Sequence, residues 1–235
     1  MKRFYKEASV APRDGGTFGI LLDGRPVRTP ARAFLALPNA ALADAIAQEW
    51  ADQGEDIDPA AMPMTGFANA AIDQVVPDPA GFAATISVYG ESDLLCYREE
   101  NPAGLAQRQA AQWQPLLDWA GQRYGISFAV TQGVIHITQP PETLARLHEA
   151  TAAHDPFLLA ALSPLVGISG SLVIGLAVVE QAFDLARLWQ AAELDELWQA
   201  EQWGDDDEAL ARRARRHQDF THAARFAALT RQGQA

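Results

Sequence analysis

One uncharged segment, Pro156 to Val179, constrains the fold more than any other part of the sequence. Its length matches the roughly 20 apolar residues that cross a bilayer. However, Pro164 removes a backbone donor in the middle of the segment, and small residues from Gly167 to Ser171 interrupt the helical pattern. Asp155 and Glu180 flank the segment, with no basic or aromatic belt at either end. We therefore predict two short buried helices joined by a turn, and no membrane insertion.

The composition is typical of a folded globular protein with an acidic surface. Hydrophobic residues make up 49% of the 235 residues, which is enough for one large domain or two small ones. A formal net charge of −12 disfavours nucleic acid and anionic lipid as partners. Cys96 is the single cysteine, and the N-terminal residues lack the apolar core of a signal peptide. We expect a cytoplasmic protein that binds no nucleic acid.

The N-terminal part is predicted to contain a β-hairpin. Thr17 to Leu22 is a short apolar run, and Asp23-Gly24 is a strong two-residue turn signal. Arg25 to Thr29 would return as the partner strand, and Pro30 would end it.

A helix is predicted after Pro38-Asn39, because apolar residues then recur on one helical face, namely Leu42, Ala43, Ile46, Ala47 and Trp50. The segment Met62-Pro63-Met64 is apolar, and we expect it to be irregular. We place a boundary shortly after it. Residues 1–68 would form a small mixed α/β domain.

Residues 69–235 are predicted to form a larger, mostly α-helical bundle domain, so the fold class is α+β. One helix is expected to begin at Asn101-Pro102, with Pro115 as a place for a kink, and to bury Leu105, Gln109, Trp113, Leu116, Leu117, Ala120 and Tyr124. Others should follow Pro140-Pro141, Asp155-Pro156 and Ser169/Ser171. Alternating apolar residues predict a second hairpin, Ile126 to Thr138, which could belong to either domain.

Several fragments resemble catalytic motifs but lack the geometry that the chemistry requires. The segment Gly167–Ser171 lacks the final glycine and the preceding strand of a nucleophile elbow. His148-Glu149 is followed by Ala152, where a zinc-protease helix needs its second histidine. The glycines do not have the spacing of a phosphate-binding loop. We therefore expect no catalytic residues, no metal and no cofactor.

An acidic stretch followed by a basic one is the most concentrated polar feature; it comprises Glu193, Asp195, Glu196, Glu201, Asp205, Asp206, Asp207 and Glu208, then Arg212, Arg213, Arg215 and Arg216. One interpretation is a helix start with Asp205 as N-cap, Glu208 at the third helical position, and a Glu208–Arg212 pair. Another is a docking surface in which Trp198 and Trp203 anchor a partner. A third is a carboxylate-dependent hydrolytic enzyme that uses residues 193–208.

A series of short motifs is spread in order along nearly the whole chain; they are Arg3-Phe4-Tyr5-Lys6, Leu22 to Pro30, Ile46 to Trp50, Met62 to Thr65, Asp93 to Arg98, Ser169 to Leu172, and Asp195-Glu196 through Gln199 to Trp203-Gly204. The series resembles that of the ATP synthase F(1) assembly chaperones that act on the alpha subunit, of the mitochondrial assembly factor 2 type. The absence of a presequence makes the chain similar to a bacterial member.

The resemblance implies a chaperone that holds new alpha subunit until the beta subunit replaces it, without cofactor or catalysis. It also implies an important acid near the Trp203-Gly204 motif, which we carry onto Glu196, Asp207 or Glu208. The mitochondrial pattern has Glu at the position of Asp207, so Glu208 is a rival. We expect a monomer that binds its client around Trp203 or on the Trp50 helix, in the cytoplasm, or in the mitochondrial matrix for eukaryotic relatives.

Overall fold

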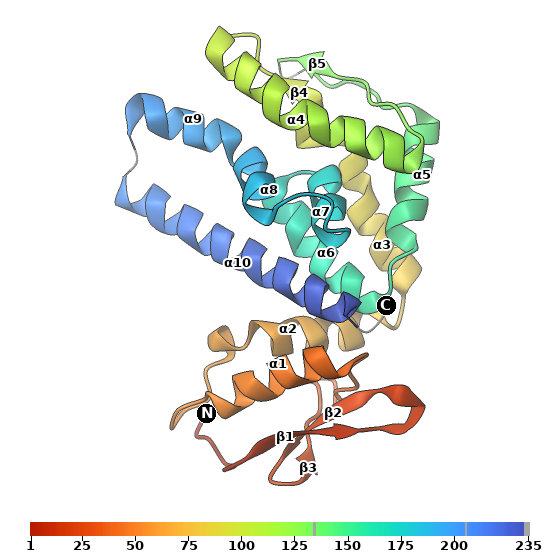
Figure 1. Ribbon diagram of the computed structural model, residues 1–235, viewed down its shortest axis with the longest axis vertical. Coiled ribbons are helices and arrows are strands. Elements are labelled where there is room, and N and C mark those ends of the chain that lie inside the picture. Colours follow the sequence, from red (N-terminus) through yellow and green to blue (C-terminus); the bar gives the residue numbers. More distant parts are fainter. Residues whose placement is uncertain (134, 205, 233–235) are drawn as a thin grey trace. The chain divides into compact units, whose positions relative to one another are not determined.

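The computed structural model describes residues 1–133, 135–204 and 206–232, which form two compact units. The first unit comprises Met1–Pro79, Asp155–Ala161 and the residues from Arg225 onward, and the second comprises Ala80–His154 and Leu162–Ala224. The helices α6 (Pro156–Ser169) and α10 (Asp207–Arg231) contribute residues to both. The predicted α+β class is confirmed, because strands near the N-terminus precede mostly helical structure (Figure 1). The boundary after residue 68 stays a prediction.

A three-stranded antiparallel sheet begins the first unit, in the order β1-β2-β3; the strands are β1 (Ala8–Pro12), β2 (Phe18–Leu22) and β3 (Arg25–Pro26). The predicted hairpin is confirmed, since Leu22 pairs with Arg25 across the turn. Asp23 and Gly24 have φ angles of 47° and 77°, as a two-residue hairpin turn requires. The carboxylate of Asp23 also accepts hydrogen bonds from the backbone N–H groups of Lys6 and Glu7. The sequence patterns did not reveal β1.

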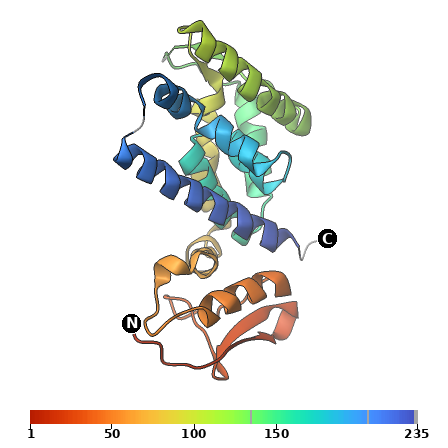
Figure 2. The same cartoon turned by 60° about the vertical axis from the view of Figure 1, so that its left-hand side comes forward.

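Helix α1 (Ala40–Ala51) packs on β1 and β2, as Figure 2 shows. The side chain of Asn39 caps it by accepting from the N–H of Leu42 at 2.9 Å. The predicted apolar face is confirmed, because Leu42, Ala43 and Ile46 are buried. A cluster of Tyr5, Leu22, Ile57 and Met62 completes this core, with Ala8, Val27 and Trp50 packed against it.

The segment predicted to be irregular is instead the start of helix α2 (Pro63–Ala70). Pro63 occupies the first helical turn, where its missing N–H costs no bond. The carboxylate of Glu49, on α1, accepts from the N–H of Met64 at 2.7 Å and from the N–H of Thr65 at 2.8 Å. Glu49 therefore caps α2 from another helix, which a local sequence pattern does not show. The chain continues from α2 into a short π-helix, η3 (Ala71–Val75). The unit also contains two 3-10 turns earlier in the chain, η1 (Asp14–Gly16) and η2 (Pro59–Ala61).

The C-terminal end of α10 also belongs to the first unit. The side-chain amide of Asn39 donates to the backbone carbonyls of Leu229 and Thr230 at 3.0 and 2.9 Å. These carbonyls lie in the last turn of α10, where helical carbonyls lack partners within the helix. The ring centroid of Phe226 lies 5.2 Å from that of Phe67. It lies 6.3 Å from that of Phe157, and these two rings are stacked.

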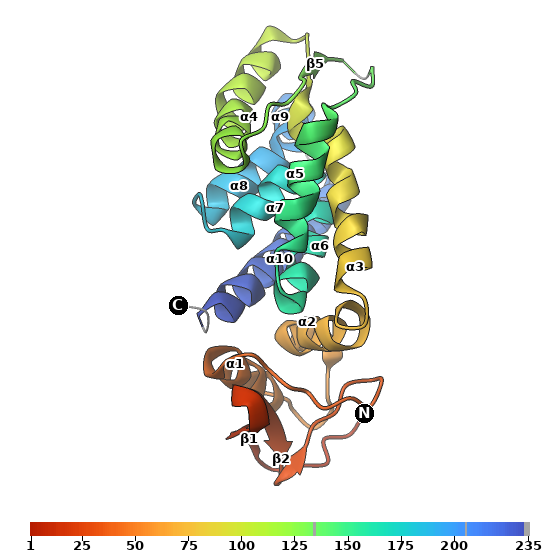
Figure 3. The same ribbon diagram turned by 90° about the vertical axis from the view of Figure 1, so that its right-hand side faces the viewer.

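The second unit is mostly helical (Figure 3), with α3 (Pro79–Ser87), η4 (Val88–Ser92), η5 (Leu94–Cys96), β4 (Tyr97–Arg98), α4 (Ala103–Tyr124), β5 (Thr131–Gln132), α5 (Pro141–Ala152), most of α6 and α10, α7 (Leu172–Val179), α8 (Leu185–Ala192) and α9 (Leu194–Trp203). All residues of α7 are buried. A Cβ atom on Gly175 would lie 2.5 Å from the side chain of Val166 on α6, so the two helices approach closely because this residue is glycine. The prediction of two short buried helices is confirmed. No helix in the described ranges is long and apolar enough to cross a bilayer.

Two polar side chains accept hydrogen bonds from the backbone N–H groups at the N-terminus of the buried helix α7. The hydroxyl of Ser171 accepts from the N–H of Ile174 at 3.0 Å. The carboxylate of Asp93, which is completely buried, accepts from the N–H of Val173 at 3.0 Å and from the N–H of Leu95 at 3.1 Å. One carboxylate thus ties η5 to α7. Burial raises the pKa of Asp93 to about 6, although these hydrogen bonds oppose the shift.

Helix α4 confirms the predicted periodicity for its core positions, since Leu105, Gln109, Trp113, Leu116, Leu117 and Ala120 are buried, whereas Tyr124 is only partly so. The helix begins one residue later than predicted, with Pro102 at its N-cap. Pro115 lies within one continuous helix. The indole N–H of Trp113 donates to the carbonyl of Ala191 at 2.8 Å and joins α4 to α8.

The predicted hairpin from Ile126 to Thr138 is wrong in the described part of that segment, which omits residue 134. Strand β5 pairs instead in parallel with β4, and Thr131 lies opposite Tyr97. The buried side-chain amide of Gln139 donates to the carbonyl of Ala129 at 2.8 Å and accepts from its N–H at 3.0 Å. A side chain thus bonds to backbone groups that a returning strand would have used. The segment belongs to the second unit.

Replacing Glu49 tests the cap between helices. Glu49→Ala removes three hydrogen bonds to α2, and we expect the free energy of unfolding to fall by about 2 kcal/mol. Asp44→Ala is the matched control, because Asp44 is an exposed carboxylate on the same helix and its loss should change stability by less than about 0.5 kcal/mol. Urea unfolding followed by tryptophan fluorescence measures both. Equal losses in the two variants would contradict the capping role.

Titration tests Asp93. Because its folded-state pKa of about 6 lies above the unfolded value of 3.8, the folded protein binds more protons between these values, and stability falls as pH rises through this window. The expected loss is about 3 kcal/mol relative to Asp93→Asn, which cannot ionise. Unfolding free energies of both proteins at pH 3 and pH 7 give this difference. Asp184→Asn is the control, since that N-cap carboxylate is exposed; a similar pH effect there would contradict the burial argument.

Candidate interaction surface on helices α9 and α10

A buried acid holds the junction of α8 and α9 against α10. Glu193 lies between these two short helices and is almost completely buried. Its carboxylate lies 2.8 Å from Nη2 of Arg216 and 3.8 Å from Nε of Arg213, both on α10. The atoms are not aligned for hydrogen bonds to Glu193, so the contact is an ion pair. Burial raises the pKa of Glu193, and the two arginines oppose the shift.

Two further acids of this stretch bond to α4. The amide of Gln109 donates to Asp195 at 2.8 Å and accepts from the N–H of Glu99 at 2.7 Å. Arg108 donates to Glu201 at 2.8 Å. Burial raises the pKa of Asp195, whereas the Arg108 guanidinium lowers the pKa of the exposed Glu201. The acids at 193, 195 and 201 therefore fix the position of α9.

Trp198 and Trp203 have different environments although both lie on α9. The guanidinium carbon of Arg108 lies 4.7 Å from the ring centroid of Trp198. On α4, a Cβ atom at Gly104 would lie 2.7 Å from Cη2 of the same indole. Trp198 is thus packed against α4. Trp203, at the C-terminal end of α9, is 75% exposed.

The remaining acids of the stretch that the structure describes are exposed, and two of them, Asp207 and Glu208, begin α10 shortly after Trp203. Glu196, Asp207 and Glu208 are exposed, as is Leu210 one turn into α10. The C-terminal end of α9 and the N-terminal end of α10 lie beside each other in Figures 1 and 2. We call the group of Trp203, Asp207 and Glu208 the α9–α10 tip. Glu196 lies apart from it, in the first turn of α9, about two helical turns before Trp203. An exposed tryptophan beside exposed acids is a chemically suitable anchor for a partner with basic surroundings.

Asp206 caps α10 by accepting from the N–H of Ala209 at 2.7 Å. Glu208 is consequently the second helical residue and not the third, so the predicted capping box is wrong. Among the described residues, no ion pair joins Glu208 to Arg212, since these side chains do not reach the distance for one. Asp205, the N-cap predicted from the sequence, lies outside the described residues.

Trp50 belongs to the first unit, whereas the other four predicted site residues belong to the second. Its indole is partly buried, with its ring centroid 5.7 Å from that of Tyr5 in an edge-to-face contact. The hydroxyl of Tyr5 donates to the carbonyl of Trp50 at 2.7 Å. Trp50 therefore contributes to the core under the sheet, and the structure does not bring it together with the α9–α10 tip in one unit.

The sequence did not reveal the hydrogen-bonding roles of four polar residues that position the elements, namely Glu49, Asp73, Asp93 and Gln109. Their one common signal is a polar side chain within a run of buried apolar positions, as Gln109 lies between Leu105 and Trp113 on the buried face of α4. Such a position needs an internal hydrogen-bond partner. A partner comes from a distant element in each case. The sequence signal therefore indicates that a hydrogen bond is needed but does not identify the partner.

The described side chains show no arrangement typical of a metal site, because no three His, Cys, Asp or Glu residues among them converge. Glu193, Asp195 and Glu201 each bond to a different partner, as described above. An open groove of about 400 Å³ in this unit lies between α4 and residues 126–130, and Leu117, Ile126, Phe128 and Val130 contribute to its lining. No acid of the α9–α10 tip lines it.

Comparison with known proteins identifies the family. The model of the family described as ATP12 chaperone protein matches residues 2–121, about half of the chain. The chain belongs to the ATP12 chaperone family. This membership confirms the resemblance drawn from the sequence motifs. The match covers the first unit's N-terminal elements and most of α4, and it ends before the α9–α10 tip.

Solved structures extend the similarity of this ATP12-family chaperone to its whole length. Atp12 from Paracoccus denitrificans is 43% identical, with a TM-score of 0.93 over 98% of both chains. A mutant of Paracoccus denitrificans Atp12p with an aspartate replaced by lysine gives 42% identity and a TM-score of 0.94 over 98% of both chains. A protein of Agrobacterium tumefaciens is 42% identical, with a TM-score of 0.92 over 97% of this chain and 85% of that one.

A glycine substitution tests how α9 is positioned. Gly104→Ala places a methyl group 2.7 Å from Trp198, so the indole and α9 must shift; we expect a stability loss of about 1–3 kcal/mol. Gly167→Ala, also in a helix of this unit, meets no atom within 4 Å and should stabilise by up to about 1 kcal/mol. Thermal unfolding monitored by circular dichroism measures both. A neutral Gly104→Ala variant would show that α9 is not held by this contact.

Proposed function

We propose that this ATP12-family chaperone binds the unassembled alpha subunit of the F(1) sector of ATP synthase, prevents its aggregation and promotes F(1) assembly. Family membership carries the proposal. The exposed Trp203 with its acidic neighbours supports the α9–α10 tip as the contact surface. The protein acts as a monomer in the cytoplasm, by binding alone, without catalysis or cofactor.

The acids of residues 193–208 would have two different roles in such a surface, one structural and one in client binding. Glu193, Asp195 and Glu201 hold α9 by bonds to α10 and α4, so Trp203 is presented on a supported helix. Preorganisation of this kind lowers the entropy lost on binding. The exposed acids at the tip would select a client surface with basic residues, mainly through the association rate.

Release needs no chemical step in this proposal. A subunit awaiting assembly exposes the surface that its partner subunit will cover. The chaperone can leave when the beta subunit binds that surface more tightly, because the difference between the two affinities sets the exchange. A single exposed aromatic anchor with a charged rim suits a contact of moderate strength.

Light scattering of purified alpha subunit, with and without an equimolar amount of this protein, tests the proposal. Wild type should suppress aggregation. Trp203→Ala should bind the client about tenfold more weakly or worse, as an aromatic anchor does when truncated. Glu196→Ala, Asp207→Ala and Glu208→Ala identify which acid contributes.

Glu149→Ala is the matched control, because Glu149 is an exposed acid on α5 in the same unit. It should suppress aggregation as wild type does. The beta subunit serves as the alternative client in a parallel assay. Suppression of beta but not alpha aggregation, or no suppression of either by the folded protein, would contradict the proposal.

A further inference from the structure

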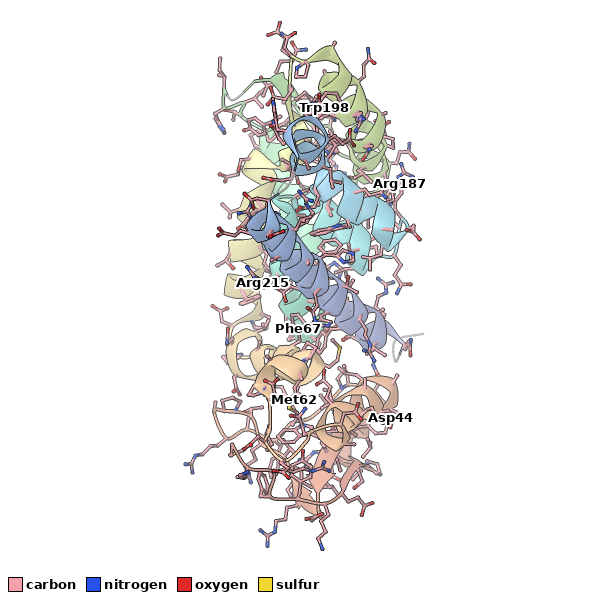
Figure 4. All side chains as sticks on the ribbon, turned by 90° about the vertical axis from the view of Figure 1, so that its left-hand side faces the viewer. Asp44, Met62, Phe67, Arg187, Trp198 and Arg215 are labelled. Atoms are coloured by element: carbon pink, nitrogen blue, oxygen red, sulfur yellow. The ribbon has the colours of Figure 1, made fainter. Side chains whose placement is uncertain are left out.

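The positive charge of this acidic chain is concentrated at its N-terminal end. Residues 1–38 carry seven Lys and Arg against three Asp and Glu, whereas the whole chain carries 18 against 30. The N-terminal segment is therefore net positive, and the remainder is strongly negative. Figure 4 shows nitrogen-tipped side chains projecting from the strands of the first unit. A local charge opposite to that of the rest of the molecule indicates a surface for an anionic partner.

Residues 27–35 of the first unit form a short hairpin that carries two of these basic residues, Arg28 and Arg32. Arg28 and Phe34 pair as an antiparallel bridge, and the N–H of Thr29 donates to the carbonyl of Ala33 at 2.9 Å. Asp73, on the π-helix η3, fixes the hairpin. Its carboxylate accepts from the hydroxyl of Thr29 at 2.6 Å and from the N–H of Ala31 at 3.0 Å.

Two guanidiniums of this region share one exposed aromatic ring. The guanidinium carbons of Arg13 and Arg28 lie 4.4 Å and 4.0 Å from the ring centroid of Phe34. Arg28 also donates from Nη1 to the carbonyl of Arg32 at 2.8 Å. The ring and this hydrogen bond hold the arginines in place before any partner arrives, which reduces the entropy lost on binding.

No carboxylate neutralises these arginines within the part of the chain that the structure describes. Asp14 adjoins Arg13 in sequence and Asp73 anchors the hairpin, but neither forms an ion pair with Arg13, Arg28 or Arg32. Like charges that are held close together without counter-charges repel one another. An anionic partner would relieve this repulsion.

Arg32 is held in a left-handed conformation, with φ of 69°, which glycine adopts more readily. Asp23 has a similar φ, and its side chain bonds to the neighbouring strand. The exposed side chain of Arg32 makes no comparable bond within the described protein. Replacing it therefore removes a charge without removing an internal contact.

We propose that Arg13, Arg28, Arg32 and Phe34, which we call the cationic hairpin face, bind an acidic segment of the client protein. Guanidiniums bind carboxylates in bidentate geometry, and the phenyl ring offers contact to an apolar residue between the acids. The negative remainder of the chain disfavours long polyanions such as nucleic acid and extended anionic lipid surfaces. That the segment belongs to the client rests on the proposed function.

Fluorescence polarisation with a short labelled peptide, rich in glutamate and with a central phenylalanine, tests the surface directly. The full-length protein should bind this peptide with salt-sensitive affinity and should not bind the corresponding glutamine peptide. Arg32→Glu and Arg28→Glu should each bind roughly tenfold more weakly. Arg187→Glu is the matched control, because Arg187 is exposed and lies 4.7 Å from the ring of Phe183 in the second unit; it should bind as wild type does.

Arg32→Gly separates recognition from folding. It removes the charge and relieves the left-handed backbone, so the thermal midpoint should not fall while peptide binding weakens. Absence of peptide binding by wild type, or equal weakening by Arg187→Glu, would overturn the inference. Stronger binding of single-stranded DNA or of phosphatidylserine vesicles than of the peptide would overturn it as well.

The client is tested separately from the peptide. Affinity for purified alpha subunit should fall in Arg32→Glu and remain in Arg187→Glu. If wild type binds the alpha subunit and Arg32→Glu binds it equally well, the client does not supply the acidic segment. If wild type binds the peptide at the cationic hairpin face but does not bind the alpha subunit, the proposed client is wrong and the surface remains supported.

Discussion

The second unit depends on satisfying the backbone of a helix that has no exposed side. Every residue of α7 is buried, so its first N–H groups cannot bond to water and need partners inside the protein. Ser171 and Asp93 supply them. Two of the family-like motifs, Asp93 to Arg98 and Ser169 to Leu172, thus meet at one end of one helix. Arg98 extends the connection, because it donates to the carbonyls of Leu95 and Gln109 and fixes η5 to α4.

The same principle explains the first unit, where a polar side chain of one element satisfies backbone groups of another. Glu49 caps α2, Asp73 fixes the hairpin of residues 27–35, and Asn39 bonds to the carbonyls at the end of α10. Each bond joins segments that are distant in sequence. The positions of the elements within this unit therefore depend on a few polar side chains as well as on the apolar core.

The acidic stretch near the C-terminus combines two of the roles that its sequence allowed. Glu193, Asp195 and Glu201 bond within the protein, whereas Glu196, Asp207 and Glu208 are exposed. The former act on structure and the latter are available to a partner. The exposed acids and the cationic hairpin face give the chaperone surfaces of opposite charge on separate compact units.

The sequence by itself determined the features that depend on neighbouring residues. Asp23-Gly24 specified the hairpin turn, and helical periodicity specified α1 and α4. Gly170, with a φ of 67°, separates the two short helices α6 and α7, whereas Pro164 lies inside α6. The ordered motifs specified the family. Only the tertiary structure decided that residues 63–70 form a helix, that residues 126–138 do not pair as a hairpin, and which acids are exposed. In each of those cases a side chain from another segment decides the outcome. Glu49 caps α2, Gln139 bonds to the backbone of Ala129 in place of a partner strand, and Arg216 pairs with Glu193. A local pattern records the preference of a segment and not the distant group that satisfies its backbone or its charge.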